Sequence, residues 1–293
     1  PYQDQIGRIC LSTNKGVNII DLKSGKNFTL TQNTGLLSDF TTGFFEDSKG
    51  YMWIGNFKGI SILNNDQDTI SYFTQDQGLE ENSTVTKLFK DHLGKMWLGT
   101  NRGKIYSLSG IDGSSIEEYT ISQNPQQLVY NLVEDNQGQI WTGILQGGIY
   151  KVDVVGHRPG NFNKEDGLGS NSFWSTLEAK DGKIWLGSYE GIDVYDPQTE
   201  TVRHLDEKQG MVNSWAPRLK EDSHGRIWVC GGILGVSIID PAKETIQQLT
   251  SKHGLATDTI SSIVEDKNGL IWMGGSKGEI LIVDLENHVF KHS

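Results

Sequence analysis

Residues 46–55 read Glu-Asp-Ser-Lys-Gly-Tyr-Met-Trp-Ile-Gly, and this phrase decides the fold because it returns along the whole chain. Its pattern is an acidic residue, Asp, two polar residues, Gly, any residue, Ile or Met, Trp, any residue and Gly. A degraded copy at the start of the chain has Cys10 in the tryptophan position. A fixed period of about 40–50 residues built from short strands is typical of a radial or stacked array. The other copies repeat at intervals of 43 or 44 residues, with their tryptophans at Trp53, Trp97, Trp141, Trp185, Trp228 and Trp272.

The repeat over residues 78–120 shows how one copy is expected to fold. The β-branched and aromatic residues at 85–89 indicate a strand, and Lys-Asp-His-Leu-Gly at 90–94 then turns the chain. The Asp side chain accepts backbone N–H groups in such a turn, and Gly supplies the positive φ. Further strands are expected at 96–99, 105–108 and 116–119. The sequence therefore predicts an all-β, seven-bladed β-propeller with four antiparallel strands per blade.

The repeats run from end to end without a linker, so residues 1–293 are expected to form a single domain. The innermost strand of the first blade is not visible, and we expect it outside the chain, which would make this chain a fragment of a larger protein. Innermost strands are visible in the other six repeats, beginning near Phe40, Val85, Val129, Phe173, Trp215 and Ile260.

Composition excludes several classes of partner. A net charge of −11 disfavours nucleic acid and direct contact with an anionic membrane, since both recruit basic surfaces. No apolar run approaches the roughly 18–20 residues of a membrane helix. The two cysteines, Cys10 and Cys230, occupy different positions in repeats that would not be neighbours in a ring of seven. We therefore expect no disulfide and two buried thiols.

Most of the recurring residues are expected to be structural. The tryptophan falls in the second strand, where a large ring fills the wedge between neighbouring sheets. The recurring Asp is a turn residue, because a calcium loop would place alternating carboxylates ahead of its Gly. The seven histidines show no metal-ligand spacing, and no nucleophile elbow or phosphate loop is present. The sequence thus predicts no metal, no cofactor and no enzymatic activity.

Variable residues indicate where a ligand would bind. Loops from an outer strand to the next inner strand share one face with the loops between second and third strands, and we call this the upper face. The loops between second and third strands carry variable residues, including Arg102 and Tyr189. Function is usually carried by variable loops on a rigid scaffold. We therefore expect the site on the upper face.

Trp174 and Trp215 break the repeat at the same place, the start of inner strands five and six. Both follow loops with polar side chains, which include Asn171 and Asn213. A flat ring near the axis offers an apolar face to a sugar, and Asn and Ser bond hydroxyl groups. The alternative interpretation is extra packing between these two blades.

A polar or small residue also recurs three positions before the acidic residue of each turn. In two repeats it is a cation, Lys87 or Arg218, which would place positive charge beside the central channel of an acidic molecule. Such a pair would hold a carboxylate or a sulfate. The alternative is a solvated channel without a specific ligand.

The phrase at 46–60, together with Gly-Leu at 78–79, resembles the two-component regulator propeller repeat, as do residues 90–103, 134–149 and 265–278. The resemblance implies the periplasmic sensor region of a hybrid histidine kinase of the Bacteroidetes type. It further implies an oligosaccharide or related small-molecule ligand, and a neighbouring propeller and β-sandwich domain as partners. The family has no fixed ligand motif, so no binding residue is carried over.

Two other functions stay open at this point. The ring could dock a protein or form a homodimer, which an exposed apolar patch of Phe57, Ile144, Leu145 and Leu234 would favour. The repeat is also distantly similar to that of streptogramin-lyase-like enzymes, which implies a lyase or lactonase. Acidic residues and histidines converging at the channel mouth would favour the enzyme.

Overall fold

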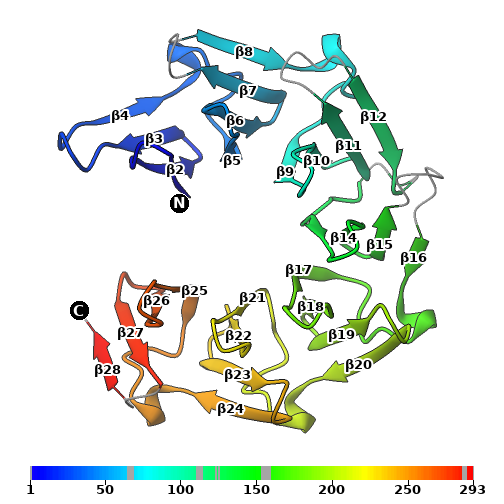
Figure 1. Ribbon diagram of the computed structural model, residues 1–293, viewed down its shortest axis with the longest axis vertical. Helices are drawn as coiled ribbons and strands as arrows, with labels where there is room; N and C mark the ends of the chain where they lie inside the picture. Colours follow the sequence, from blue (N-terminus) through cyan, green and yellow to red (C-terminus); the bar gives the residue numbers. More distant parts are fainter. Residues whose placement is uncertain are drawn as a thin grey trace. The chain divides into compact units, whose positions relative to one another are not determined.

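The computed structural model describes residues 2–64, 69–109, 115–122, 124, 126–152, 160–285 and 289–292. These residues form seven four-stranded antiparallel sheets (Figure 1), which confirms the predicted seven-bladed β-propeller. Three sheets belong to one compact unit and four to another, and each unit is described by itself. The units comprise Pro1–Leu132 with Val152–Pro159, and Val133–Lys151 with Gly160–Ser293.

The first unit contains three sheets, and in each of them the strands pair in chain order. Its strands are β1 (Tyr2–Gln3), β2 (Ile9–Thr13), β3 (Gly16–Ile20), β4 (Asn27–Leu30), β5 (Thr41–Glu46), β6 (Tyr51–Asn56), β7 (Gly59–Asn64), β8 (Thr69–Phe73), β9 (Val85–Lys90), β10 (Met96–Thr100), β11 (Lys104–Ser109) and β12 (Ser115–Thr120).

The second unit contains four sheets with the same strand order. Its strands are β13 (Val133–Glu134), β14 (Ile140–Ile144), β15 (Gly148–Val152), β16 (Gly160–Phe162), β17 (Phe173–Glu178), β18 (Ile184–Ser188), β19 (Ile192–Asp196), β20 (Thr201–Leu205), β21 (Arg218–Glu221), β22 (Ile227–Cys230), β23 (Val236–Asp240), β24 (Thr245–Leu249), β25 (Ile260–Glu265), β26 (Ile271–Gly275), β27 (Ile280–Asp284) and β28 (Val289–His292).

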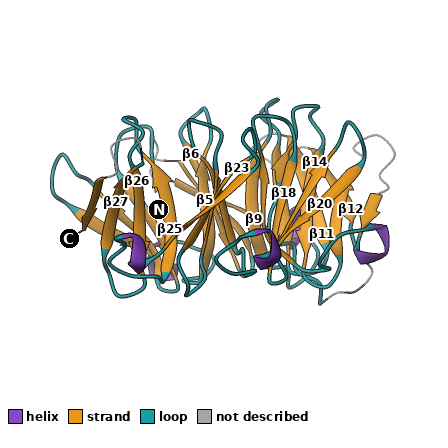
Figure 2. Ribbon diagram, turned by 90° about the horizontal axis from the view of Figure 1, so that it is seen from below, coloured by secondary structure: helices purple, strands orange, loops and turns teal. Residues whose placement is uncertain are grey.

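Short 3-10 turns follow five of the outer strands (Figure 2, purple). Each turn ends at a glycine with φ between 99° and 111°, a conformation that side chains with a Cβ rarely adopt. The Leu or Met that comes next is buried in every case. The recurring Gly-Leu or Gly-Met therefore turns the chain and anchors it in the core. The turns are η1 (Gln32–Thr34), η2 (Gln75–Gln77), η3 (Lys164–Asp166), η4 (Glu207–Gln209) and η5 (Ser251–His253).

The recurring Asp connects its turn to the recurring Trp. In the fourth blade, Asp135 Oδ1 accepts the backbone N–H groups of Gln137 and Gln139, at 3.0 and 2.9 Å. Its other oxygen, Oδ2, accepts the indole N–H of Trp141 at 2.7 Å. The same indole bond recurs in four other blades, at Trp53–Asp47, Trp97–Asp91, Trp228–Asp222 and Trp272–Asp266. One carboxylate thus closes the turn and fixes the ring.

The fifth blade lacks this bond, because Ala179 stands where the other blades have Asp. The turn keeps its backbone bonds, Ala179 N to Lys183 O at 2.9 Å and Gly182 N to Ala179 O at 2.8 Å. The buried indole nitrogen of Trp185 consequently has no hydrogen-bond partner among the described residues.

Four of the tryptophans, Trp53, Trp141, Trp185 and Trp228, pack between their own sheet and the next one. Trp53 clusters with Leu98 and Tyr106 of the following blade, and Trp185 clusters with Val229 and Ile239. The exposed fraction of five of the six tryptophans is 3% or less, as predicted for a wedge-filling ring. Trp272, in the last sheet of the chain, is 37% exposed.

Hydrogen bonds also join neighbouring blades near their turns. Glu46 accepts the backbone N–H of Gln5 at 2.7 Å, and Glu265 accepts that of Ser223 at 2.7 Å. These glutamates are the acidic residues that precede the recurring Asp. Their position in the repeat predicted no role for them, but in the structure they hold successive blades together.

Three innermost strands differ from the expectation. Tyr2 and Gln3 form β1 and pair with Cys10 and Ile9, so a short innermost strand of the first blade does lie within the chain. The innermost strand of the fourth blade begins at Val133 rather than Val129, because Val129 N bonds Thr100 O of the preceding blade instead.

In the sixth blade the innermost strand begins at Arg218, three residues after the predicted start at Trp215. The preceding residue, Pro217, has no N–H to contribute to a ladder. Trp215 therefore lies in the loop ahead of the strand.

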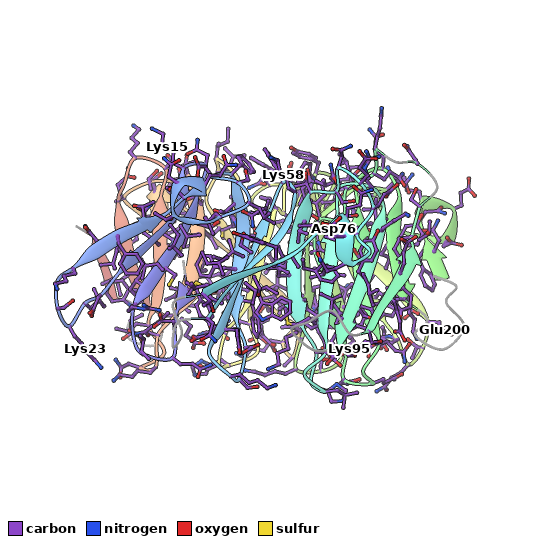
Figure 3. All side chains as sticks on the ribbon, turned by 90° about the horizontal axis from the view of Figure 1, so that it is seen from above. Lys15, Lys23, Lys58, Asp76, Lys95 and Glu200 are labelled. Carbon is purple, nitrogen blue, oxygen red and sulfur yellow. The ribbon has the colours of Figure 1, made fainter. Side chains whose placement is uncertain are left out.

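The two faces of the first unit are visible in Figure 3. Lys15 and Lys58, in loops between second and third strands, lie at one edge, and Lys23 and Lys95 lie at the opposite edge. This arrangement follows from the alternating direction of four antiparallel strands.

We expect Trp141→Phe to lower the free energy of unfolding by about 1–3 kcal/mol more than Trp185→Phe. Both variants lose the same ring volume, but only the first also breaks a buried bond and leaves Asp135 with an unpaired oxygen. Urea unfolding followed by circular dichroism measures the difference. Equal losses in the two variants would show that the Asp–Trp bond contributes nothing to stability.

Cys10 and Cys230 are both free and buried. Burial raises the pKa of the Cys10 thiol to about 11 and that of Cys230 to about 12. At pH 8 the reactive thiolate is then on the order of 0.1% or less of either residue. We expect no reaction with Ellman's reagent in the native protein and two reactive thiols after unfolding. Rapid native labelling of either cysteine would contradict this.

Candidate functional site

Three aromatic side chains of the second unit meet in the upper-face loops of the fifth and sixth blades. The ring of Tyr189 stacks on that of Trp215, with centroids 5.5 Å apart and an interplanar angle of 19°. Trp174 meets Tyr189 edge-on at 5.2 Å and 78°. Tyr189 is 55% exposed and both tryptophans are half-buried. We call these three residues the aromatic platform.

Local irregularities of the backbone place these rings. The register of β17 on β18 shifts between Phe173 and Ser175, so Trp174 is the extra residue of a bulge and is not paired in the ladder. Bulges commonly re-aim a side chain next to a functional site. Ala216 N bonds Ser188 O at 2.8 Å, which brings the residues beside them, Trp215 and Tyr189, together.

Polar atoms without partners lie in the loop before β21. The Oδ1 atom of Asn213 and the Nε1 atom of Trp215 are buried and have no hydrogen-bond partner among the described residues. Asn213 lies against Gly232, where an added Cβ would come within 2.7 Å of its Nδ2 atom. One acceptor and one donor are thus present beside the platform, as a hydroxyl-rich ligand would require.

Asn171 lies near the platform in sequence, but its side chain is already occupied. Its Oδ1 atom accepts the backbone N–H of Lys164 at 2.9 Å, the first residue of η3. Asp39 and Asp258 do the same for η1 and η5. This position therefore stabilises the loop that precedes an innermost strand.

The three predicted cations do not all belong to the unit that contains the platform. Lys87 and Arg102 belong to the first unit, and the pKa of Lys87 is lowered by desolvation although its side chain reaches solvent. The Nε atom of Arg102 is buried and has no partner among the described residues. Arg218 is exposed at the start of β21. The structure brings Trp174, Tyr189 and Trp215 together, and it places Asn213 in the loop of Trp215.

A hydrogen bond between Asp193 and His204 was not anticipated. Asp193 is buried, accepts the backbone N–H of Gly169 at 2.9 Å, and lies 2.6 Å from the Nδ1 atom of His204. Burial raises the pKa of Asp193, and the bonds from His204 and Gly169 oppose this rise. In two other blades, Ser61 and Ser237 accept the N–H of the equivalent loop residue. A polar residue directly after Gly-Ile or Gly-Val is therefore the sequence signal that could have predicted this role for Asp193.

The sequence of the chain matches a known repeat family. Residues 35–58, 167–190 and 254–277 match the profile described as two component regulator propeller. Three segments of the chain are thus two-component regulator propeller repeats. The second match contains Trp174 and Tyr189, so part of the platform lies within a typical propeller repeat. No curated protein shows significant sequence similarity to the chain.

Solved structures share the propeller fold at low sequence identity. Dihydro-heme d1 dehydrogenase NirN is 12% identical, with a TM-score of 0.71 over 97% of this chain and 63% of that one. The WD40 propeller domain of Doa1 is 16% identical, with a TM-score of 0.66 over 97% and 91%.

The extracellular domain of a B. thetaiotaomicron protein described as a hybrid two-component system is 19% identical, with a TM-score of 0.48 over 99% and 45%. The propeller spans about half the length of this domain and of a second one from that organism.

Among the described residues, no three His, Cys, Asp or Glu side chains gather in a way that could hold a metal ion. No helix in the same part of the chain is long and apolar enough to cross a membrane.

We expect Asn171→Ala to lower the free energy of unfolding by about 0.5–2 kcal/mol, as the loss of a capping side chain does elsewhere. Asn171→Asp retains the acceptor, as Asp39 and Asp258 do, and should leave stability nearly unchanged. Thermal unfolding of both variants tests this. An equal loss in the two variants would show that the cap is not what the residue provides.

Proposed function

We propose that this chain is an extracytoplasmic ligand-sensing module of a hybrid two-component sensor histidine kinase. Its repeats belong to a family named for two-component regulators, which supports a role in signalling. We further propose that the module is not itself an enzyme and that it works beside a neighbouring propeller and a β-sandwich domain of the same protein.

The aromatic platform supports an oligosaccharide as the ligand. The exposed Tyr189 ring and the half-buried Trp174 and Trp215 rings provide apolar faces for the C–H surface of a sugar. The free donor of Trp215 and the free acceptor of Asn213 suit hydroxyl groups. The combination of flat rings and unpaired polar atoms is the observation that carries this proposal.

Sensing requires that the ligand bind one state of the receptor better than another. The platform connects loops of two successive blades, and the bond from Ala216 to Ser188 fixes their spacing. A ligand that lies across these loops would favour one arrangement of the two blades. Contacts with neighbouring domains would then transmit the difference.

We expect Trp174→Ala and Trp215→Ala each to weaken binding of the cognate oligosaccharide at least about tenfold, roughly 1.4 kcal/mol. A panel of short neutral oligosaccharides, tested by isothermal titration calorimetry, identifies that ligand. Phe28→Ala is the matched control, because Phe28 is an exposed aromatic residue of β4 that is 46% exposed.

Three outcomes would decide the matter. Unchanged affinity in Trp174→Ala would remove Trp174 from the site. Unchanged affinity in both variants would place the ligand elsewhere on the propeller. Failure of every oligosaccharide to bind would contradict the proposed ligand class.

A protein-docking role is the second candidate. Phe40 and Phe57 are 40% and 45% exposed and stack with centroids 4.1 Å apart, so the first unit presents an apolar pair at its upper face. Leu234 is also exposed, in the second unit. The sequence also predicted that Ile144 and Leu145 belong to this exposed patch. The prediction is wrong for Ile144, which is fully buried in β14, and Leu145 is half-buried.

A further inference from the structure

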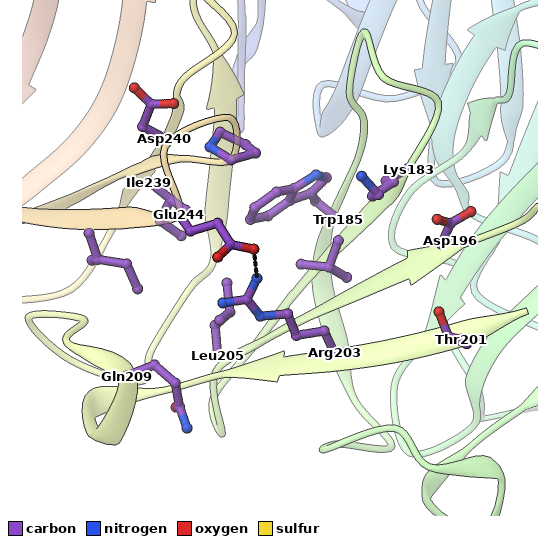
Figure 4. A pocket seen from close by; sticks show the side chains of 13 residues that line it. Lys183, Trp185, Asp196, Thr201, Arg203, Leu205, Gln209, Ile239, Asp240 and Glu244 are labelled. Atoms are coloured by element: carbon purple, nitrogen blue, oxygen red, sulfur yellow. Dashed lines mark ion pairs between the residues drawn. The ribbon is translucent and has the colours of Figure 1, made fainter. Parts of the chain in front are cut away.

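A cavity that does not involve the platform residues lies between the sheets of the fifth and sixth blades. Its volume is about 290 Å³, and Figure 4 shows its lining. Trp185 and Leu205 line one wall, and Ile239 and Ile246 line the other. We call it the outer cavity, because strands β20 and β24 contribute to it.

One residue of the cavity lining has a hydrogen-bond donor without a partner. Trp185 is 3% exposed, and its indole nitrogen is buried without an acceptor among the described residues. Five other blades supply that acceptor from the Asp six residues earlier, and the fifth blade has Ala179 there. A buried N–H without a partner costs about 1–3 kcal/mol, so an acceptor delivered by a ligand would be favoured.

Another pair of blades has a smaller cavity beside a tryptophan whose N–H is bonded. Between the second and third blades, the cavity that includes Asp47 and Trp53 measures about 140 Å³, half the volume. There Asp47 Oδ2 accepts the Trp53 indole N–H at 3.1 Å. The outer cavity is thus larger, and the indole N–H of its tryptophan has no acceptor.

Most charged side chains at the rim are in ion pairs. Asp196 accepts the backbone N–H of Gln198 at 2.9 Å. The walls behind the rim are apolar, so an anion or a cation would gain little there while losing its hydration. A neutral ligand fits better. The rim's ion pairs are Lys183–Asp181 (2.8 Å), Arg203–Glu244 (3.9 Å, Figure 4) and Lys243–Asp240 (2.8 Å).

We infer that the outer cavity binds a small neutral molecule with an apolar ring and one carbonyl or hydroxyl oxygen. The ring packs between Leu205 and Ile246, and the oxygen accepts the Trp185 indole N–H. An apolar cavity of about 150 Å³ holds benzene, so the outer cavity has room for a ring with its substituent. Lys183 also lines the cavity. Its side chain can rotate away from an entering ligand at little cost, because its ion pair with Asp181 is exposed.

The outer cavity is also joined to the platform through the chain. Gln209 lines it and is the last residue of η4. The loop after η4 carries Asn213 and Trp215. The inference does not depend on the proposed function, because its ligand differs from a sugar in class and its contacts are different residues.

Acetophenone and ethylbenzene are matched probes, since they have the same ring and similar shape but only the first has an acceptor oxygen. Two-dimensional ¹H–¹⁵N spectra of the folded protein report each indole N–H separately, and Trp185→Phe assigns the signal of Trp185. We expect acetophenone to shift this signal saturably and ethylbenzene to bind at least about fivefold more weakly. The Trp53 signal, whose N–H is bonded to Asp47, should not move. Benzoate tests charge and should bind more weakly than acetophenone.

Ala179→Asp restores the acceptor that the other blades have. We expect this variant to weaken acetophenone binding at least about tenfold while its melting temperature rises. If it does not fold, Trp185→Phe gives an independent answer, because it should abolish the preference for acetophenone over ethylbenzene. The inference is overturned if acetophenone gives no saturable shift, or if its affinity is unchanged in Ala179→Asp or its preference is unchanged in Trp185→Phe.

Discussion

The bond from a tryptophan indole N–H to the aspartate six residues earlier is the interaction on which this structure depends. The aspartate closes the first turn of a blade with one oxygen and orients the indole with the other, as Asp135 does for Gln139 and Trp141. The oriented ring then fills the wedge between two sheets. A single side chain thereby couples turn geometry to packing between blades, which is why the same ten-residue phrase can build sheet after sheet.

Because that interaction recurs, departures from it are informative. Trp174 is an additional tryptophan on a bulge and meets Tyr189 instead of the core. Ala179 removes an acceptor and leaves Trp185 with an unsatisfied N–H beside a cavity. Both departures fall in the fifth blade. This blade has lost part of the shared stabilising pattern, and it is also where candidate recognition surfaces concentrate.

The two candidate surfaces differ in chemistry. The platform combines an exposed ring, half-buried rings and free polar atoms, and it suits a hydroxylated ligand at the surface. The outer cavity is apolar with one donor, and it suits a small neutral molecule. The turn η4 contributes Gln209 to the cavity, and the next loop carries Trp215, so the two surfaces share one segment of the chain. Both surfaces lie on the fifth and sixth blades, so a ligand on either one would contact the same pair of blades.

The sequence by itself determined the seven blades, the four-stranded order and the burial of the repeated tryptophans, because these follow from a local pattern repeated in register. It also located Trp174 and Trp215 as exceptions. The sequence did not show that Asn171 caps η3, that Ile144 is buried or that Asp193 pairs with His204. It did not show that Ala179 leaves a donor unpaired at a cavity. Those facts join residues of different strands or blades, and only the tertiary packing decides which side chains meet.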